Sequence, residues 1–298
     1  MLFCVQALSK INEALWAVAF FCAHLCAKNR QMNGDLFNIF KELSNLASSS
    51  NSFNVIDEPI DIKLQMEYFK RSKKVRRDNT PQLEDVEDLV APELDDEQLR
   101  DRMILLASID DPRAYRILEE YTKDKSNRLH QWALMALQES KMLIEGNLLN
   151  ERQVFVSTGL GGRGKLLRYF VALVGNNINE FAPYQQHVIQ SEFETALKNN
   201  HSDIENIEFQ GKYAAMTVLI PLDVPCHQTL LDAVEECNLY GNFLKTDFLI
   251  TNVKTLTFEE IDDFVAGKLE EMNSDNEIDF DDIDDLEDNE SGDSNPLE

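Results

Sequence analysis

The seven residues from Gly159 to Lys165 form the pattern in this chain that comes nearest to a catalytic motif. Their sequence, GLGGRGK, fits the first part of a phosphate-binding P-loop, G-x-x-x-x-G-K, in which backbone N–H groups and a lysine hold the phosphates of a nucleotide. A P-loop then requires a serine or threonine for Mg²⁺ and a helix whose N-terminus faces the phosphates. Here Leu166 follows, and the next residues, LLRYFVALVG, have the composition of a strand. We therefore expect a flexible hairpin loop between two strands.

The same loop has the features of a site for a smaller anion. Its glycines expose backbone N–H groups, and the basic residues around it add positive charge. The candidate anion-binding residues are Gly159, Gly161, Gly162, Arg163, Gly164, Lys165 and Arg168. A phosphate of RNA or a carboxylate of a partner protein would suit this pattern. A nucleotide-dependent enzyme is a second, weaker alternative.

A second group of positive charges lies between Lys70 and Arg77. It contains six basic residues: Lys70, Arg71, Lys73, Lys74, Arg76 and Arg77. Such a cluster can bind the phosphates of nucleic acid. It lacks interleaved aromatic residues, so it supplies charge but no surface for reading bases. A solvated linker, or a strip neutralised by the acidic tail of the same chain, is the favoured interpretation.

The remaining reactive side chains form no catalytic set. The histidines His130, His187 and His201 are scattered over different predicted elements, and no Ser-His-Asp or Cys-His arrangement is visible. The five cysteines are odd in number and irregularly spaced, which argues against a disulfide framework. Cys226 and Cys237 are 11 residues apart, a spacing that suits a buried thiol better than a zinc site. We expect no metal, no cofactor and no catalytic residue.

The elements that would position these groups begin with a helical region at residues 83–150. Asp111 can cap a helix whose first turn holds Pro112, where the missing N–H is not needed. Apolar residues then recur at helical spacing through two short one-sided helices, which must pack on each other or on a neighbouring domain. The aromatic residues of this region that could contact a partner are Tyr115, Tyr121 and Trp132, although a place in the core is the favoured interpretation of Trp132.

This helical stretch resembles the HEAT family, particularly the short bacterial type found in phycobilisome-lyase-like proteins. The resemblance is carried by DDPRAYRILEEY, the turn KDKSN, and RLHQWALMALQES with its small Ala133 and Ala136. It covers about one repeat, whereas solenoids need at least about three. Residues 97–260 as a whole also look similar to cytoplasmic proteins of Bacteroidetes-type bacteria that have no assigned activity. The HEAT resemblance implies a role in protein–protein scaffolding, whereas the second resemblance implies no activity.

Residues 151–258 change to a period of two and predict an α+β domain. The order is strand–strand–helix, strand–strand–helix, and a last strand, with Gln210-Gly211-Lys212 as one hairpin turn. The two halves look alike, which suggests an internal duplication that forms a sandwich of sheet and helices. We expect ferredoxin-like character, with a connection order that differs from the simple ferredoxin-like fold.

The two ends of the chain are unlike the middle. Residues 1–82 form an N-terminal helical and linker region whose apolar stretch, 14–27, is shorter than the roughly 20 residues that span a bilayer. This stretch is interpreted as a helix of marginal relevance, with an export signal or an upstream extension of the reading frame as alternatives. Residues 259–298 contain 18 acidic residues and one base, so they carry −17 of the formal charge of −26 and are expected to be disordered.

Together these features predict a non-catalytic cytoplasmic adaptor protein. A HEAT-like helical surface and the acidic tail would bind another protein, with a basic partner such as a ribosomal or nucleic-acid-binding protein favoured by the charge of the tail. The alternative is an RNA-binding regulatory module that uses Lys70–Arg77 and the Gly159–Lys165 loop. Neither reading involves stable membrane insertion.

Overall fold

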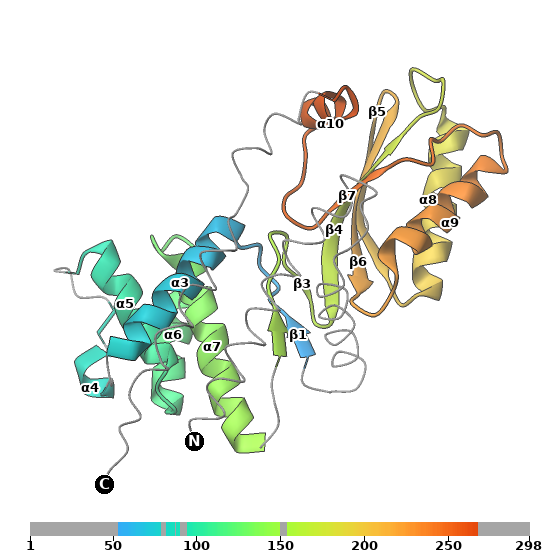
Figure 1. Cartoon of the computed structure of the whole chain (residues 1–298). Coiled ribbons are helices and arrows are strands. Elements are labelled where there is room, and N and C mark those ends of the chain that lie inside the picture. The colour runs from blue at the N-terminus through green and yellow to red at the C-terminus, as the bar shows by residue number, and fades with distance from the viewer. Residues whose placement is uncertain (1–52, 79–81, 87, 90–93, 150–153, 268–298) are drawn as a thin grey trace, which may run out of the picture. The chain divides into compact units, whose positions relative to one another are not determined.

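The computed structural model describes residues 53–78, 82–86, 88–89, 94–149 and 154–267. By its backbone contacts the chain divides into two units, one that ends at Thr255 and one that begins at Leu256. The first unit contains a cluster of helices and an α+β domain (Figure 1). The predictions for the apolar segment 14–27 and for the acidic segment 268–298 fall outside the described residues.

The helical cluster contains five helices of the described chain: α3 (Ile62–Asp78), α4 (Leu83–Val86), α5 (Asp96–Ala107), α6 (Pro112–Lys123) and α7 (His130–Leu149). Its core includes Leu99, Met103, Leu118 and Trp132, each buried to at least 99%. The predicted cap is confirmed, because Asp111 accepts a hydrogen bond from the backbone N–H of Arg113 at 2.7 Å and Pro112 is the first helical residue. Helix α7 runs nine residues beyond Ser140, the last residue of the stretch that carries the HEAT resemblance.

Helix α3 differs from the prediction, which interpreted the basic cluster as part of a linker. It is a 17-residue helix, and its buried side packs in the same core as α5 and α7. That side carries Gln65, Tyr68, Ser72 and Val75, which are spaced three and four residues apart and are all at least 92% buried. Two of these four residues are polar, so a search for apolar periodicity passes over them. The Nε2 of Gln65 donates a hydrogen bond to the carbonyl of Ile60 at 2.8 Å, which satisfies part of its polar side chain.

The α+β domain has a five-stranded sheet with the order β3-β4-β6-β5, in which β7 also pairs with β4. Its elements are β3 (Gly162–Arg163), β4 (Leu166–Val174), α8 (Pro183–Asn199), β5 (Asp203–Gln210), β6 (Tyr213–Pro221), α9 (Cys226–Asn238) and β7 (Leu249–Thr251). All the strand pairs of this sheet are antiparallel. The predicted hairpin turn is confirmed, since Gly211 joins β5 to β6 with a φ of +56°.

The strands and helices follow one another as predicted, apart from the short β3, but the pairing of the first strand differs from the prediction. Strand β2 (Val154–Val156) pairs in parallel with β1 (Phe53–Val55) in a separate two-stranded sheet, so it does not open a strand–strand–helix unit with β4. From β4 onward the order is strand–helix–strand, then strand–helix–strand, and β7 and β5 flank the central pair of β4 and β6. This is the split βαβ order of a ferredoxin-like sheet, so the prediction of a different connection order is wrong. A parallel pairing between segments about 100 residues apart leaves no signal in local periodicity.

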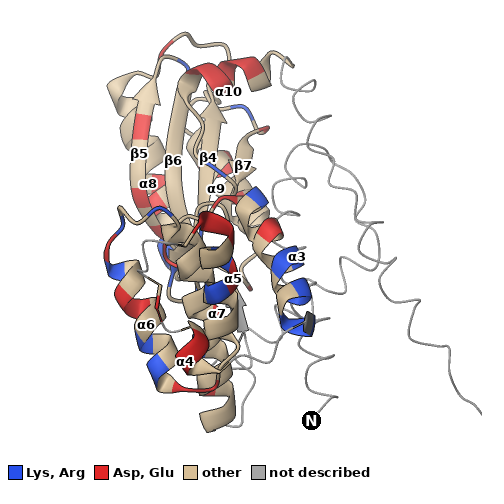
Figure 2. Ribbon diagram, turned by 90° about the vertical axis from the view of Figure 1, so that its left-hand side faces the viewer, with Lys and Arg blue, Asp and Glu red and all other residues tan. Residues whose placement is uncertain are grey.

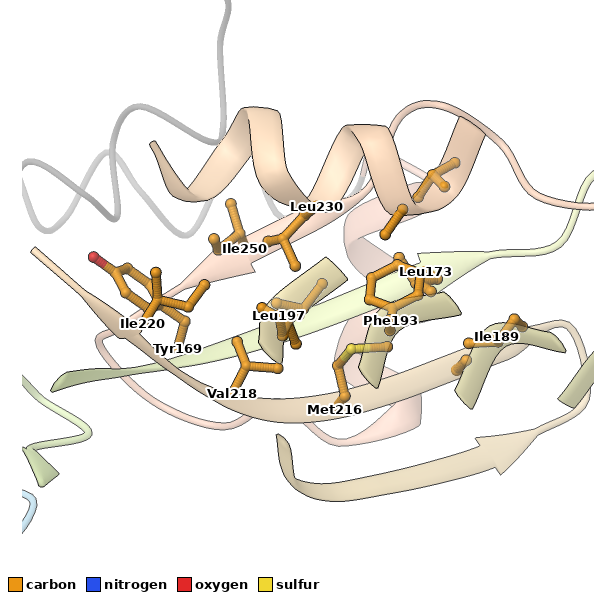
Figure 3. Packing of buried hydrophobic residues seen from close by; sticks show 14 of the residues in the cluster. Tyr169, Leu173, Ile189, Phe193, Leu197, Met216, Val218, Ile220, Leu230 and Ile250 are labelled. Atoms are coloured by element: carbon orange, nitrogen blue, oxygen red, sulfur yellow. The ribbon is translucent and has the colours of Figure 1, made fainter. Parts of the chain in front are cut away.

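Helices α8 and α9 lie side by side on one face of the sheet (Figure 1). Every second residue of β4 and β6 faces them, and Figure 3 shows Tyr169, Leu173, Met216 and Val218 packed with side chains of both helices. Phe193 of α8 is fully buried in this core. At about 25 cal/mol per Å² of apolar surface, such a two-layer core is the main stabilising contribution in the domain.

The second unit contains helix α10 (Phe258–Val265), which overlaps the stretch 259–298 that was predicted to be disordered. Thr257 caps it, since its side chain accepts a hydrogen bond from Glu260 N at 3.2 Å and the Glu260 carboxylate accepts one from Thr257 N at 2.9 Å. Such a capping box predicts the start of a helix, but the sequence interpretation weighed only the high acidic content of this segment.

Candidate functional site

The glycine loop packs closely against neighbouring backbone. A Cβ atom added to Gly159 would lie 1.9 Å from the carbonyl oxygen of Val253, and one added to Gly162 would lie 2.1 Å from that of Leu166. Two loop N–H groups bond within the fold, because Leu160 N donates to Asn252 O at 3.0 Å and Gly161 N donates to Thr158 O at 3.1 Å. These glycines therefore allow backbone segments to approach each other, which is a structural role.

The glycine loop is followed by a β-hairpin, formed by β3 and β4. Gly162 and Arg163 form β3, which pairs with Leu167 and Leu166 at the start of β4. Gly164, at the turn of this hairpin, has a φ of +63° and no neighbour within 4 Å of its Cβ position. The prediction of a passage from strand to strand is confirmed, and the helix N-terminus that a P-loop requires is not formed here.

The two arginines of the loop region are held by carboxylates of β5. Arg168 binds both carboxylate oxygens of Glu205, and its Nη1 donates to the carbonyl of Leu160 at 2.8 Å. Hydrogen bonds from Arg168 lower the pKa of Glu205, and the same carboxylate raises the pKa of Arg168. Arg163 pairs with Asp203 at 3.0 Å, and Lys165 is exposed. An anion at this loop would have to compete with Glu205 and Asp203.

Two arginines of the second basic group point into the helical cluster. Arg76 pairs with Glu139 of α7, whose carboxylate also accepts a hydrogen bond from the hydroxyl of Tyr68 at 2.7 Å. Burial and the charge of Glu139 raise the pKa of Tyr68 well above its ordinary value. Arg71 pairs with Asp101 and Glu97 of α5. These arginines therefore join α3 to its neighbours.

The other bases of α3 lie on its outer side. Lys70, Lys74 and Arg77 are exposed, and so is Lys63, the second residue of the helix. Figure 2 shows the lysines and arginines of α3 in blue along the helix. We call Lys63, Lys70, Lys74 and Arg77 the basic row. Lys73 lies beside this row, with its Nζ 4.5 Å from the centre of the Phe69 ring. The sequence interpretation missed Lys63, which the spacing of 7, 4 and 3 residues would have placed on the same face.

The three aromatic interaction candidates have different positions. Trp132 is fully buried, its indole N–H donates to the carbonyl of Arg100 at 3.2 Å, and its ring meets Tyr68 edge to face at 5.0 Å. It belongs to the core, which confirms the favoured interpretation of Trp132. Tyr115 and Tyr121 are partly buried, and burial raises the pKa of both.

Two further titratable groups, Glu58 and Cys237, have pKa values that their structural contacts explain. Burial raises the pKa of Glu58, but hydrogen bonds and charges from Lys125 and His130 outweigh it, so the pKa lies below its ordinary value. Burial raises the pKa of the Cys237 thiol to about 12, as expected for an inert thiol. Within the part of the chain that the structure describes, no group of three or more His, Cys, Asp or Glu side chains could hold a metal ion.

Two features escaped the sequence interpretation. A groove of about 380 Å³ runs between α8 and β5, lined by Glu194 and Lys198 on one side and by Asp203 and Glu205 on the other. Asn252, fully buried beside the glycine loop, has no hydrogen-bond partner for either side-chain polar atom. Asn252 reaches the glycine loop from a distant part of the chain, which leaves no signal in the local sequence. The groove lies between consecutive elements, but its shape depends on how α8 packs beside β5.

Among the described residues, no helix combines the length and apolar character that crossing a bilayer requires.

The chain was also compared with known proteins. No protein-family model matches it, and a search of curated proteins finds no match either.

Proposed function

We propose that this chain is a non-catalytic adaptor protein of the cytoplasm. The helical cluster, which we take as HEAT-like, supplies a rigid surface, and the acidic C-terminal segment binds a basic partner such as a ribosomal or nucleic-acid-binding protein. The duplication of the α+β domain also remains a proposal, with strand–helix–strand as the repeated unit.

The separation of charge along the chain carries this proposal. Residues 259–298 hold −17 of the net charge, while α3 has seven bases against two acids and presents four of these bases on its outer side. Opposite charges on different elements allow one protein to recognise two differently charged surfaces. In contrast, the arginines of the glycine loop are paired with β5, so that region supports the proposal less.

A quantitative capture experiment tests the adaptor proposal. The full chain is compared with a full-length variant in which Asp279, Asp281, Asp282, Asp284 and Asp285 are changed to Asn. Proteins retained from a cell lysate are measured by mass spectrometry. We expect a discrete basic protein to be lost with the variant and kept by a control with Glu235→Gln and Glu236→Gln on α9. Identical retention by all three chains would contradict a binding role for the acidic segment.

Nucleic-acid binding through the basic row is the second candidate. Four exposed bases on one helix face favour it, because phosphate contacts supply most non-specific affinity. Fluorescence anisotropy with single-stranded RNA at low salt tests it. Affinity should fall with salt with a slope of about −3 for four phosphate contacts on a single strand. The variant Lys70→Glu/Lys74→Glu should lose binding, and Lys198→Glu on α8 should retain it.

The nucleotide alternative has a simple test. If the loop held a triphosphate, millimolar ATP or GTP would raise the melting temperature, and Lys165→Ala would abolish the rise. Because β4 follows the loop, we expect no shift in either chain.

A further inference from the structure

Strand β5 forms one edge of the sheet in the α+β domain. Its eight residues pair with β6, and within the described part of the chain no strand pairs with its other side. Figure 2 shows β5 as the outermost strand of the sheet, with acidic residues in red. The edge of a sheet presents unpaired backbone N–H and C=O groups, to which another extended chain can add as a new strand.

The groove between α8 and β5 lies beside this edge. Its volume is about 380 Å³, and its apolar lining comes from Ile204 and Ile207 of β5 and from Leu197 of α8. In the register with β6, the two isoleucines lie opposite the core residues Val218 and Met216, so they are on the face of the sheet that carries the helices. Every second side chain of a strand added to β5 would point to this face and reach the groove.

The opposite face of β5 is acidic. The register with β6 places Asp203 and Glu208 on the face away from the helices. Glu205, which the register skips at a bulge, pairs on that face with Arg168. Arg163 pairs with Asp203, and Glu208 is exposed. A strand added to β5 would therefore meet carboxylates along this face, to which basic side chains are complementary.

The charge of β5 limits which chain can add to its edge. The strand contains three acids and no base. In antiparallel pairing of two copies of β5, the acids of both strands would lie on the same face of the joined sheet and repel one another. A nucleic acid would be repelled by the same acids and would gain nothing from the isoleucines. A peptide that alternates apolar and basic residues suits both faces.

We propose that the edge of β5 binds an extended segment of a partner protein in which apolar and basic residues alternate. The backbone of this segment pairs with β5, and its apolar side chains enter the groove beside α8. Its basic side chains lie next to Asp203, Glu205 and Glu208. The eight residues of β5 span about 27 Å, which leaves room for about six to eight residues of the partner.

An NMR titration of the isotope-labelled full chain with a synthetic peptide tests this proposal. The probe is a peptide of alternating valine and lysine, blocked at both ends and equal in length to β5. We expect the largest amide shift changes within Asp203–Gln210. Hydrogen exchange of the β5 amides should also slow, because new backbone hydrogen bonds form there.

Two altered peptides separate strand pairing from attraction by charge alone. A peptide methylated at every backbone nitrogen keeps all its charges but cannot donate hydrogen bonds to β5, so it should bind at least about tenfold more weakly. A peptide with glutamate in place of lysine should also bind more weakly, because its acids face those of β5. Equal binding of the methylated peptide would overturn the proposal.

Variants of the chain test the acidic face. Glu208→Lys should weaken binding about three- to fivefold, because it reverses a charge beside the basic side chains. Glu235→Lys on α9, which is also exposed, is the matched control and should leave binding unchanged. No binding at millimolar peptide, or shift changes away from β5, would contradict the proposal.

The same spectra reveal whether a second copy of the chain occupies the edge. Shift changes at β5 that depend on protein concentration without peptide would show such self-pairing and would overturn our choice of partner. The assay involves neither the acidic C-terminal segment nor the basic row of α3, so its failure would leave the adaptor proposal standing.

Discussion

The glycine loop and helix α3 are both rich in positive charge, yet the fold uses their charges differently. At the loop, Arg163 and Arg168 are paired with carboxylates of β5, and the glycines lie against other backbone segments. On α3 the bases are divided between the two sides of the helix. Arg71 and Arg76 bind acids of α5 and α7, while Lys63, Lys70 and Lys74 lie outside.

The difference shows that the number of bases in a segment is a poor guide to a binding site. An arginine beside an acidic strand has a structural role, because its guanidinium forms bidentate hydrogen bonds that hold the arginine and the carboxylate in place. Lysines at helical spacing on an exposed face stay available to a partner. The predictions below compare a buried or paired group with an exposed neighbour in the same region.

The largest effect is expected at the closely packed glycines. Gly159→Ala places a methyl group 1.9 Å from Val253 O, so backbone must move, and we expect a loss of about 4 kcal/mol or more in the free energy of unfolding. Gly164→Ala meets no neighbour and should cost only about 1 kcal/mol, from its positive φ. Urea denaturation measures both, and equal losses would contradict the close-approach role of Gly159.

The inward arginine of α3 should matter next. Arg76→Met leaves Glu139 without its ion pair beside the buried Tyr68, and we expect a loss of about 2 kcal/mol. Lys74→Met on the outer side should change stability by less than about 0.5 kcal/mol. Thermal unfolding compares the two, and a double variant with Glu139→Gln should recover part of the loss. A larger loss for Lys74→Met would reverse our assignment of the two sides.

The same comparison applies to the loop. Arg168→Met breaks the pair with Glu205 and the hydrogen bonds to two carbonyls, for an expected loss of about 1.5 kcal/mol. Arg163→Met breaks a pair whose side chains are more than half exposed, so less than about 0.5 kcal/mol is expected. Chemical denaturation at low salt distinguishes them. Equal losses of stability in the two variants would contradict the stronger structural role that we assign to Arg168.

The smallest expected effect is a change in the pH dependence of stability, through the carboxylate of Glu205. The folded pKa of Glu205 lies below its ordinary value of 4.5, so the folded chain binds fewer protons than the unfolded chain near that pH. The stabilisation by Glu205 is therefore complete above about pH 4.5 and is lost as the pH falls through the lowered pKa. In Glu205→Gln the melting temperature should fall less steeply below pH 4.5 than it does in the unchanged chain. An unchanged profile would contradict the lowered pKa.

Much of the fold could be predicted from local sequence. The start of α6 follows from Asp111 and Pro112, and the β5–β6 hairpin follows from Gly211, because caps and turns depend on neighbouring residues. Helix α3 was missed because its buried side contains Gln65 and Ser72 in place of apolar residues. The pairing of β1 with β2 could not be predicted, since it joins segments that are distant in the chain.

The candidate site was predicted only in part. The sequence located both groups of positive charge, but it could not show that Glu205 and Asp203 lie beside the loop, because β5 reaches that position only through the sheet. It listed Arg71 and Arg76 with the lysines of α3, although helical spacing separates them. The burial of Trp132 follows from its helical spacing with Leu129, Ala133 and Ala136, and the packed cluster confirms it.

Our central claim is that the outer side of α3, and not the glycine loop, is the basic binding surface of this protein. The most direct test is an NMR titration of the full chain with a short single-stranded RNA at low salt. We predict amide shift changes concentrated in Ile62–Asp78 that disappear at high salt. Changes concentrated in Gly159–Arg168, with α3 unaffected, would contradict the claim.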